Sequence, residues 1–264
     1  MSAREEVLIE LEGFALELAH TAGGIAEAYF RSHFSVDNKD EKGFDPVTSA
    51  DHAIEKVLRE TIQSTYPEHG IVAEESGSTA TDAEYCWYID PIDGTRAFLM
   101  GSPLWGTLVG LTVSGRAVVG LLAQPILGEL FFGSPAGSWL IRSDGRKRLK
   151  SSQCADLGSA RLSSTHPGMF RGNDKTAFDR LAAACLLDRY GGDCYNYAML
   201  AAGFADLVVE SGLKPFDIVP LVPILEQAGC VVTSWEGGSV LAGGNVVAAA
   251  SAKLHEQALK VLGA

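Results

Sequence analysis

The hydrophobic pattern of the chain changes its period once within its first half. Over residues 5–30 and again over residues 50–62, apolar side chains recur at intervals of three and four, which predicts two amphipathic helices. Short β-rich runs punctuated by Gly, Pro and Ser follow, at residues 71–73, 86–89, 104–113, 117–123 and 130–132. The third and fourth runs are separated only by Ser114-Gly115-Arg116, which predicts a hairpin. The sheet is therefore at least partly antiparallel, which argues against a plain dinucleotide-binding fold.

The second half alternates predicted helices with predicted strands, as α/β proteins do. Helical patterns cover residues 175–188, 195–205, 218–227 and 252–262, and strand patterns cover residues 160–163, 207–209, 231–233 and 246–250. Pro220 is expected in the first turn of the third of these helices, and Pro223 is expected to bend it. A polar, basic stretch near residues 144–152 indicates a soft boundary between an N-terminal α+β half, 1–146, and a C-terminal α/β half, 147–264.

Charge and composition exclude several classes of protein. The 264 residues include 21 Lys and Arg against 33 Asp and Glu, a formal net charge of −12, and 47% are hydrophobic. This balance is typical of a folded chain and not of a disordered one, and it disfavours nucleic acid and anionic membranes as partners. The first residues lack the pattern of a secretory signal and no stretch suits a membrane helix, so we expect a cytoplasmic protein.

Cysteine and histidine spacing gives no metal motif. The five cysteines form an odd set without CxxC or CxxH spacing: Cys86, Cys154, Cys185, Cys194 and Cys230. We therefore expect buried free thiols, and neither a disulfide framework nor a zinc site. The six histidines show no HxH or HExxH spacing, and neither of the common glycine-rich nucleotide-binding loops occurs among the 29 glycines.

The most informative segment reads WYIDPIDGTRAF, in which an apolar strand runs directly into Asp90 and Asp93. Pro91 disfavours helical geometry before it and Gly94 permits a tight turn, so both carboxylates can project toward one point. Two like charges held there need a cation, and Mg²⁺ prefers carboxylate and carbonyl oxygens. Thr95 is expected to cap a short helix whose N-terminal amides suit a phosphate. The alternative is an ordinary Asp-Pro turn followed by an Asp-Gly turn.

Three further acidic positions could complete such a site. Glu74-Glu75 ends an apolar strand, from which side chains reach a cleft at a sheet edge, although a solvated turn is an equally common explanation. Asp217 precedes an apolar helical run, where an N-cap is the alternative and is compatible with metal binding. Asp51 lies in the first turn of the second helix, where the helix dipole favours its charge, and it follows Thr48 and Ser49, which are possible N-caps.

Together, the segments DPVTSAD, AEESG, WYIDPIDGTRAF and LKPFDIVPLVPILEQAG resemble, in order and separation, the inositol monophosphatase-like family of metal-dependent phosphatases. The motifs run from Asp45 to Gly229, and by length and element order the resemblance covers the whole chain. It implies a five-layered αβαβα sandwich with a mixed, partly antiparallel N-terminal sheet. It also implies Mg²⁺-dependent hydrolysis of a small phosphate monoester.

The resemblance also implies roles for individual residues. Two or three Mg²⁺ ions, with Mn²⁺ as an alternative, would be held by Glu74, Asp90, the Ile92 carbonyl, Asp93 and Asp217. The bridging ligand would be Asp90. Catalytic roles would fall to Glu74, Thr95 and Asp51, of which the last two would orient the attacking water. The phosphate would be received by the amides of Gly94 and Thr95, and the ligands would be supported from outside by Asp45.

The late motif departs from the commonest family form. Phe216 stands where a tryptophan is usual, Val219-Pro220 replaces two small residues, and Cys230 replaces a glycine. Because Asp217 is intact, these departures concern packing and substrate choice more than metal binding.

The strings LWGTL, QPILGE, GDCY and LKPFD are similar to the histidinol-phosphate phosphatase branch, which completes the penultimate stage of histidine biosynthesis. The expected substrate-binding residues are Asp93, Asp193 and Glu210. Carboxylates at the non-phosphate end of a pocket would suit the amine and imidazole of histidinol phosphate, since charge-assisted hydrogen bonds favour cations. The alternatives are a helix N-cap for Asp193 and a solvated strand-end residue for Glu210.

Two other functions stay open. An inositol monophosphatase or broad-specificity sugar phosphatase would use the same metal chemistry, and a non-catalytic regulatory relative would use the fold as an interaction surface. The intact set of candidate ligands, with Thr95, argues against the second of these. Family habit suggests a homodimer that acts on a small phosphate monoester.

Overall fold

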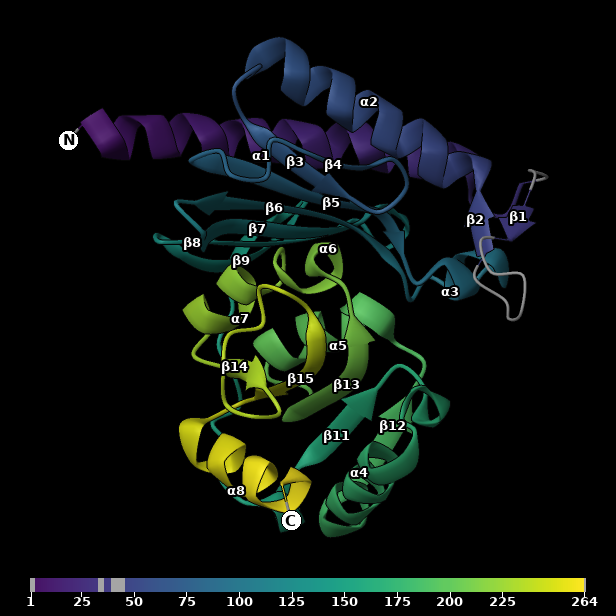
Figure 1. Ribbon diagram of the computed structural model, residues 1–264, viewed down its shortest axis with the longest axis vertical. Helices are drawn as coiled ribbons and strands as arrows, with labels where there is room; N and C mark the ends of the chain where they lie inside the picture. The colour runs from purple at the N-terminus through teal and green to yellow at the C-terminus, as the bar shows by residue number, and fades with distance from the viewer. Residues whose placement is uncertain (1–2, 33–35, 39–45, 264) are drawn as a thin grey trace.

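The computed structural model describes residues 3–32, 36–38 and 46–263 (Figure 1). The elements of the N-terminal part are α1 (Ala3–Tyr29), β1 (Val36–Asn38), β2 (Pro46–Thr48), α2 (Ser49–Thr65), β3 (Gly70–Ala73), β4 (Gly77–Thr79), β5 (Tyr85–Asp93), α3 (Thr95–Leu99), β6 (Gly106–Val113), β7 (Arg116–Gln124), β8 (Glu129–Ser134), β9 (Gly137–Arg142) and β10 (Gly145–Arg148). Those of the C-terminal part are β11 (Arg161–Ser164), α4 (Gly172–Ala184), β12 (Leu187–Tyr190), α5 (Asp193–Ala201), β13 (Leu207–Leu213), α6 (Pro215–Ile218), α7 (Val222–Gln227), β14 (Val231–Ser234), β15 (Gly244–Ala249) and α8 (Ala252–Leu262).

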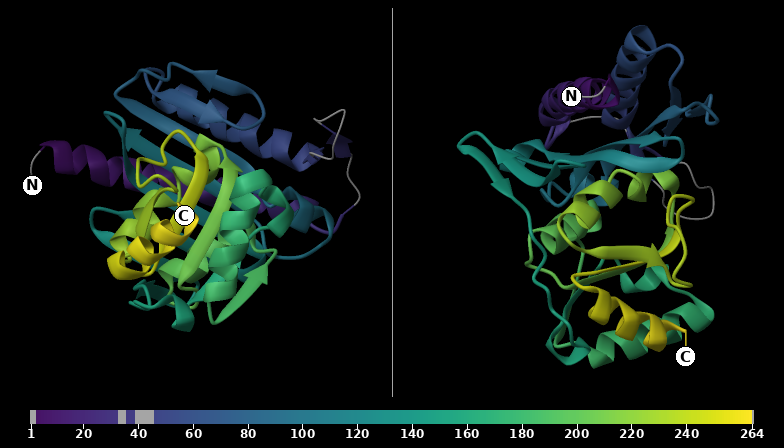
Figure 2. Two further views of the ribbon diagram at one scale, coloured as in Figure 1. Left: turned by 60° about the horizontal axis from the view of Figure 1, so that its bottom comes forward. Right: turned by 90° about the vertical axis from the view of Figure 1, so that its left-hand side faces the viewer.

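The elements stack in five layers. Helices α1 and α2 cover one face of an eight-stranded sheet, α5, α6 and α7 lie between that sheet and a five-stranded one, and α4 and α8 cover the far face (Figures 1 and 2). The larger sheet has the order β10-β9-β8-β7-β6-β5-β3-β4 and is antiparallel except between β3 and β5. The smaller sheet has the order β12-β11-β13-β15-β14 and is also mixed. The expected αβαβα sandwich with a mixed first sheet is confirmed.

The elements with a strong period lie where the sequence predicts them. Both amphipathic helices form, and their apolar stripes pack with Trp87 and Leu111 in one buried cluster above the larger sheet. The predicted hairpin joins β6 to β7: Val113 pairs with Arg116, and Ser114 and Gly115 both adopt positive φ, as a tight hairpin turn requires.

Several sequence-based expectations were wrong in detail. The helix expected over 175–188 ends at Ala184, and Leu187–Tyr190 is an exposed edge strand whose side chains show no burial period. The helix expected over 218–227 is two short helices, with Pro220 in the break and Pro223 in the first turn of α7, because a proline lacks the N–H that would continue the earlier helix. Strands β4, β9 and β10 were not predicted; β4 and β10 are short, exposed and polar.

Three glycines form a row across the larger sheet. Gly110 pairs with Gly120, and Gly120 pairs with Gly133. A Cβ at Gly120 would lie 1.9 Å from the Pro220 carbonyl oxygen, and one at Gly133 would lie 2.3 Å from a backbone nitrogen of α7. The row therefore leaves a groove without side chains, on which the α6–α7 segment rests. This close approach brings α6, and with it Asp217, against β5.

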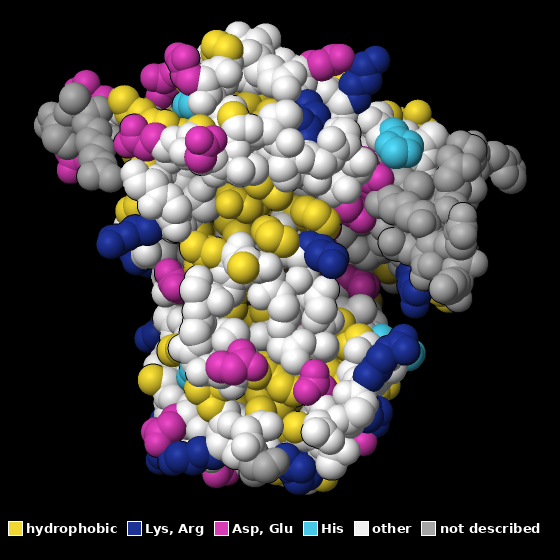
Figure 3. All heavy atoms as spheres, viewed as in Figure 1, with side chains coloured by type: hydrophobic (Ala, Val, Ile, Leu, Met, Phe, Trp, Pro, Cys, Tyr) yellow, Lys and Arg dark blue, Asp and Glu magenta, His cyan; other side chains and the backbone are white. Residues whose placement is uncertain are grey.

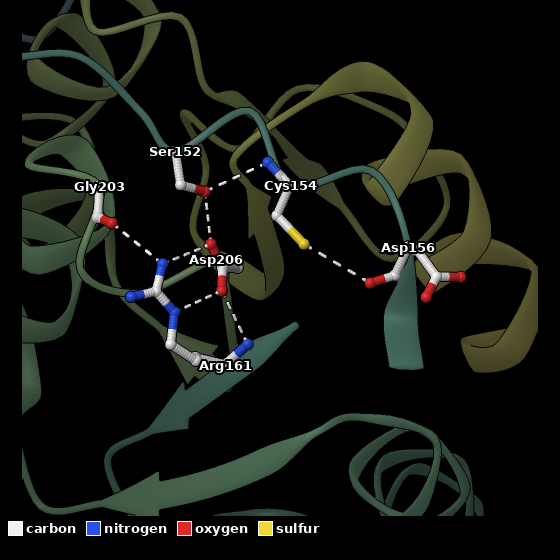
Figure 4. Close-up of polar contacts among 6 residues, drawn as sticks. All are labelled: Ser152, Cys154, Asp156, Arg161, Gly203 and Asp206. Carbon is white, nitrogen blue, oxygen red and sulfur yellow. Dashed lines mark hydrogen bonds and ion pairs between the residues drawn. The ribbon is translucent and has the colours of Figure 1, made fainter. Parts of the chain in front are cut away.

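The buried carboxylate of Asp206 holds the segment that connects the two sheets, between β10 and β11, against the start of β11. Asp206 accepts hydrogen bonds from the Nε (2.7 Å), Nη2 (2.9 Å) and backbone N–H (2.9 Å) of Arg161, and from the Ser152 hydroxyl (Figure 4). Arg161 Nη2 also donates to the Gly203 carbonyl at 3.0 Å. Although burial raises it, the bonds from Arg161 and Ser152 hold the pKa of Asp206 below its usual value. The segment that joins β10 to β11, which contains Ser152, is thus fixed at the N-terminal end of β11. Thr165 follows the other end of that strand.

Charged side chains of both signs lie on the surface. On the face shown in Figure 3, Lys and Arg side chains are scattered among acidic ones, and hydrophobic side chains gather at mid-height. Within the part of the chain that is described, no helix is long and apolar enough to cross a bilayer.

The boundary expected after residue 146 falls inside β10, which pairs with β9, so the division into halves stays a prediction.

Candidate active site

Acidic side chains from both halves of the chain meet in one cavity of about 210 Å³. Its lining residues are Glu74, Asp90, Ile92, Asp93, Gly94, Thr95, Thr165, Met169, Asp193, Glu210, Leu213 and Asp217. Glu74 and Asp93 stand at the carboxyl ends of the parallel strands β3 and β5, and Thr165 directly follows β11. Thr95, Asp193 and Asp217 lie in the first turns of α3, α5 and α6, where the helix dipole favours negative charge. The sheets and helices therefore direct carboxylates to one point.

A backbone irregularity brings Asp90 and Asp93 to the same cavity. In a regular strand, side chains three residues apart point to opposite faces. The register between β5 and β6 shifts between Asp90 and Asp93, and Pro91, which has no N–H to donate, lies inside the shift. The Thr107 hydroxyl donates to the Pro91 carbonyl at 2.8 Å and fixes the displaced backbone. The predicted surface-turn alternative for this segment is wrong, because Asp90 is 3% exposed.

The aspartates form a cluster suited to a hard cation. One carboxylate oxygen from each of Asp90, Asp93 and Asp217 lies within 4.8 Å of the others. Asp93 Oδ1 accepts from the Cys194 N–H at 2.8 Å, and Asp217 Oδ2 accepts from the Lys214 N–H at 2.7 Å. Asp90 Oδ1 is buried and has no hydrogen-bond partner among the described residues. An all-oxygen donor set with such a buried oxygen fits Mg²⁺.

Electrostatics supports the same conclusion. Burial, followed by the negative charges of Glu74, Asp93 and Asp217, raises the pKa of Asp90 well above its usual range. Burial and the charges of Asp193 and Asp217 do the same for Asp93. Burial also raises the pKa of Asp217 to about 7, against the opposing hydrogen bond from Lys214. With so many carboxylates in a poorly solvated space, a bound cation is the natural compensation.

A second acidic group adjoins the first. Carboxylate oxygens of Asp51, Glu74 and Glu75 lie within 4.8 Å of one another. Asp51 is fully buried in the first turn of α2, where Asp51 Oδ2 accepts from the Thr48 N–H (2.7 Å) and hydroxyl (2.6 Å) in a capping box. It does not line the cavity, so its predicted role in orienting water stays a prediction. Asp45, the other outlying candidate, is outside the described residues.

Gly94 and Thr95 form the turn predicted to receive phosphate. Gly94, and not Thr95, is the N-cap of α3, with φ of +88°, and a Cβ there would lie 3.2 Å from the Asp193 Cβ. Both the backbone conformation and the close approach therefore require glycine. The Thr95 hydroxyl donates to the Ile92 carbonyl at 3.1 Å, so the predicted phosphate turn and the predicted carbonyl ligand are directly linked.

The remaining polar residues of the cavity form a second group around Thr165. Thr165 donates to Glu210 Oε1 through its N–H (3.0 Å) and its hydroxyl (2.5 Å), and Tyr197 donates to Oε2 at 3.4 Å. Glu210 is 3% exposed, so the solvated strand-end alternative is wrong. The N-cap alternative for Asp193 is also wrong: Gly192 is the cap, and Asp193 is the first helical residue, with φ of +43°.

The pKa values of this second group follow from burial. Burial raises the pKa of Glu210 to about 8, against the opposing hydrogen bonds from Thr165. Burial raises the pKa of Asp193 to about 6, while the charge of Arg96 and a hydrogen bond to Thr165 act in the opposite direction. Ionisation of Glu210 is therefore costly, whereas the charge of Arg96 offsets part of the cost for Asp193.

Sequence reasoning missed Thr165, Met169 and Leu213. Thr165 lies two residues after the end of the predicted strand 160–163, a position similar to that of Glu74, whereas Met169 and Leu213 carry no such signal. Three of the cysteines are buried as expected, but Cys154 and Cys185 are only half-buried, and all five are free thiols. No described histidine lines the cavity.

Comparisons with known proteins agree with this geometry. A sequence profile of the inositol monophosphatase family matches residues 8–263. The chain belongs to the inositol monophosphatase family. It is 38% identical to the bifunctional phosphatase IMPL2 of Arabidopsis thaliana, over 96% of this chain and 76% of that protein. It is 32% identical to a histidinol-phosphatase of Mycobacterium tuberculosis, over 95% of this chain and 96% of that one.

Solved structures extend the comparison to the fold. An inositol monophosphatase from Zymomonas mobilis superposes with a TM-score of 0.86 at 35% identity, covering 100% of both chains. Membership of the inositol monophosphatase family makes the chain a phosphatase that acts on phosphate monoesters.

Proposed function

We propose that this chain is a Mg²⁺-dependent phosphatase that hydrolyses L-histidinol phosphate to L-histidinol and phosphate. The observation that carries the proposal is the pair Asp193 and Glu210, a half-buried and a buried carboxylate in the same cavity as the aspartate cluster. Similarity to two histidinol-phosphatases, at 31% and 32% identity, supports it.

The charges divide the cavity into two regions. The carboxylates that raise the pKa of Asp90 are Glu74, Asp93, Asp217 and Asp51, whereas Asp193 and Glu210 act on Asp93 together with Asp217. We assign the first region to the metal and the phosphate, and the second to the amine and imidazole of the substrate. An ammonium or imidazolium group there would pair with carboxylates that are otherwise costly to ionise.

The shape of the second region supports the same substrate. Met169 and Leu213 contribute apolar surface to the same cavity. An imidazole ring can rest against a thioether and an aliphatic chain. A polyol would lose hydrogen bonds with water where it lies against that apolar surface. The positive φ of Asp193 is a further sign of a functional position, since such backbone strain is retained where the surrounding structure enforces it.

The mechanism assigns one task to each group. Glu74, Asp90, the Ile92 carbonyl, Asp93 and Asp217 would hold Mg²⁺, which supplies Lewis acidity toward the phosphate and toward water. The amides of Gly94 and Thr95 donate to the phosphate oxygens. Thr95 orients the attacking water, and Asp51, whose carboxylate lies beside that of Glu74 but does not line the cavity, would assist it. The water oxygen bonds to phosphorus as the bond from phosphorus to the histidinol oxygen breaks. One proton of the water passes to that oxygen, which leaves as the alcohol, and the other proton stays with the phosphate.

Asp193→Asn tests the substrate assignment. Asparagine keeps the shape and tolerates positive φ, so the variant removes the charge and little else. We expect kcat/KM for histidinol phosphate to fall about ten- to hundredfold, the cost of about 1.5–3 kcal/mol for losing a charged hydrogen-bond partner. Turnover of myo-inositol 1-phosphate, which carries no cation, should change much less.

Steady-state kinetics with both substrates checks this prediction. Asp82→Asn, at an exposed turn, is the matched control and should leave both substrates unaffected. Equal losses on both substrates for Asp193→Asn would remove the physical argument for histidinol phosphate.

A further inference from the structure

Glu55 is a buried carboxylate on α2 that no part of the mechanism uses. It is 2% exposed and lies one helical turn after Asp51, so the two side chains share one face of the helix. That face looks onto the turn between β3 and β4, which begins with Glu74. A buried carboxylate is costly unless its oxygens are well satisfied, so its partners indicate its purpose.

The partners of Glu55 all belong to that turn or support it. Glu55 Oε2 accepts from the Glu75 N–H at 2.7 Å, and Oε1 accepts from the Ser76 N–H at 2.8 Å and from the Ser76 hydroxyl. Arg59, one further turn along α2, donates to Glu55 Oε1 at 3.4 Å and to the Gly77 carbonyl. The carboxylate thus holds two consecutive backbone amides, and Arg59 holds the carbonyl that follows.

The turn lies at the edge of the larger sheet. Ala73 pairs with Gly77, so Glu74, Glu75 and Ser76 form the connection between the strands. Strand β4 is three residues long, exposed and at the edge of the sheet. On its other side, Glu74 is fixed by its own N–H, which donates to the Ile89 carbonyl at 3.3 Å, next to Asp90. Glu74 is therefore anchored by β5 before the turn and by Glu55 after it.

We propose that Glu55 is a positioning residue for the metal site: by capping the turn after Glu74, with Arg59 as its partner, it sets the place of the Glu74 carboxylate relative to Asp90. The proposal rests on the assignment of Glu74 as a metal ligand. Residues that orient metal ligands from outside typically change metal affinity ten- to hundredfold when they are replaced. A carboxylate is needed because both of its oxygens accept, whereas the NH₂ of an amide cannot accept from a backbone N–H.

The test measures Mg²⁺ binding to the full chain by calorimetry without substrate, together with Tm in EDTA. Glu55→Gln should weaken Mg²⁺ binding about tenfold or more. Ser76→Ala, which removes only the hydroxyl bond, should weaken it by a few fold and guards against a Glu55→Gln chain that fails to fold. Glu60→Gln, an exposed glutamate on the same helix, is the matched control and should bind Mg²⁺ like the wild type.

The outcomes separate this proposal from the proposed function. If Glu55→Gln and Ser76→Ala lower Tm in EDTA but bind Mg²⁺ within about twofold of the wild type, Glu55 is only structural and the proposal is overturned. Weakened Mg²⁺ binding in these variants supports it, even if the wild type shows no activity on histidinol phosphate, in which case only the substrate assignment fails. A wild-type chain that binds no Mg²⁺ overturns both.

Discussion

Asp90→Asn is expected to lower kcat/KM for phosphate-ester hydrolysis by at least about a thousandfold, or about 4 kcal/mol of transition-state stabilisation, while the fold stays intact. Asp90 is the proposed bridging ligand, and its Oδ1 is buried without a hydrogen-bond partner among the described residues. The substitution removes a charge from the point where two ions would meet. Near-normal turnover at saturating Mg²⁺ would rule out the assigned site.

Stability provides the control for Asp90→Asn. Burial and neighbouring carboxylates raise the pKa of Asp90, so the folded chain holds that proton more tightly than the unfolded chain. The stabilisation that comes from protonated Asp90 is complete below the pKa of the unfolded chain, about 4. It is lost as the pH rises toward the pKa of Asp90 in the folded chain. Without metal at pH 8, Asp90→Asn should therefore have a Tm equal to or above that of the wild type. Added Mg²⁺ should raise Tm much less in the variant. A large loss of metal-free Tm would instead indicate general damage.

Gly120→Ala is expected to cost at least about 3 kcal/mol in the free energy of unfolding, at the upper end of overpacking effects. The added Cβ would lie 1.9 Å from the Pro220 carbonyl oxygen and 2.9 Å from the carbonyl carbon. Both are backbone atoms, so no side-chain rotation relieves the contact. Lifting the α6–α7 segment would also move Asp217 away from Asp90 and Asp93, so Mg²⁺ binding should weaken.

Urea denaturation and Mg²⁺ titration check this prediction. The matched control is Gly13→Ala, in α1, where an added Cβ meets nothing within 4 Å. It should be neutral or stabilising by up to about 1 kcal/mol, because alanine favours the helix. If Gly120→Ala were as stable as Gly13→Ala, the glycine row would not be what sets the position of α6.

Local chemistry allowed much of the fold, and the convergence of Asp90 and Asp93 on one point, to be predicted from the sequence, whereas the full set of proposed metal ligands came from the resemblance to the family. The period of α1 and α2, the Ser114-Gly115 turn and the proline and glycine beside Asp90 and Asp93 each act within a few residues of the chain. The prediction of β12 fails because its side chains show no alternation of buried and exposed positions. The break between α6 and α7 was also missed, because packing of this segment against the glycines of the sheet sets where the helix is interrupted.

The remaining features depend on pairing between distant segments. The register shift that turns Asp90 and Asp93 to one cavity is a property of β5 and β6 together. The glycine row exists only once β6, β7 and β8 are in register, and the hydrogen bonds of Glu55 and Thr165 reach residues 20 or more positions away. No pattern within a short window contains such information.

The most direct test of the account is the rate of phosphate release by the wild-type chain from L-histidinol phosphate and from myo-inositol 1-phosphate, each with Mg²⁺ and with EDTA. We expect kcat/KM to favour histidinol phosphate by at least about tenfold, since only that substrate carries cations for Asp193 and Glu210. Both activities should vanish in EDTA and return with Mg²⁺. Preference for the inositol phosphate would contradict the substrate assignment, and full activity in EDTA would contradict the metal site.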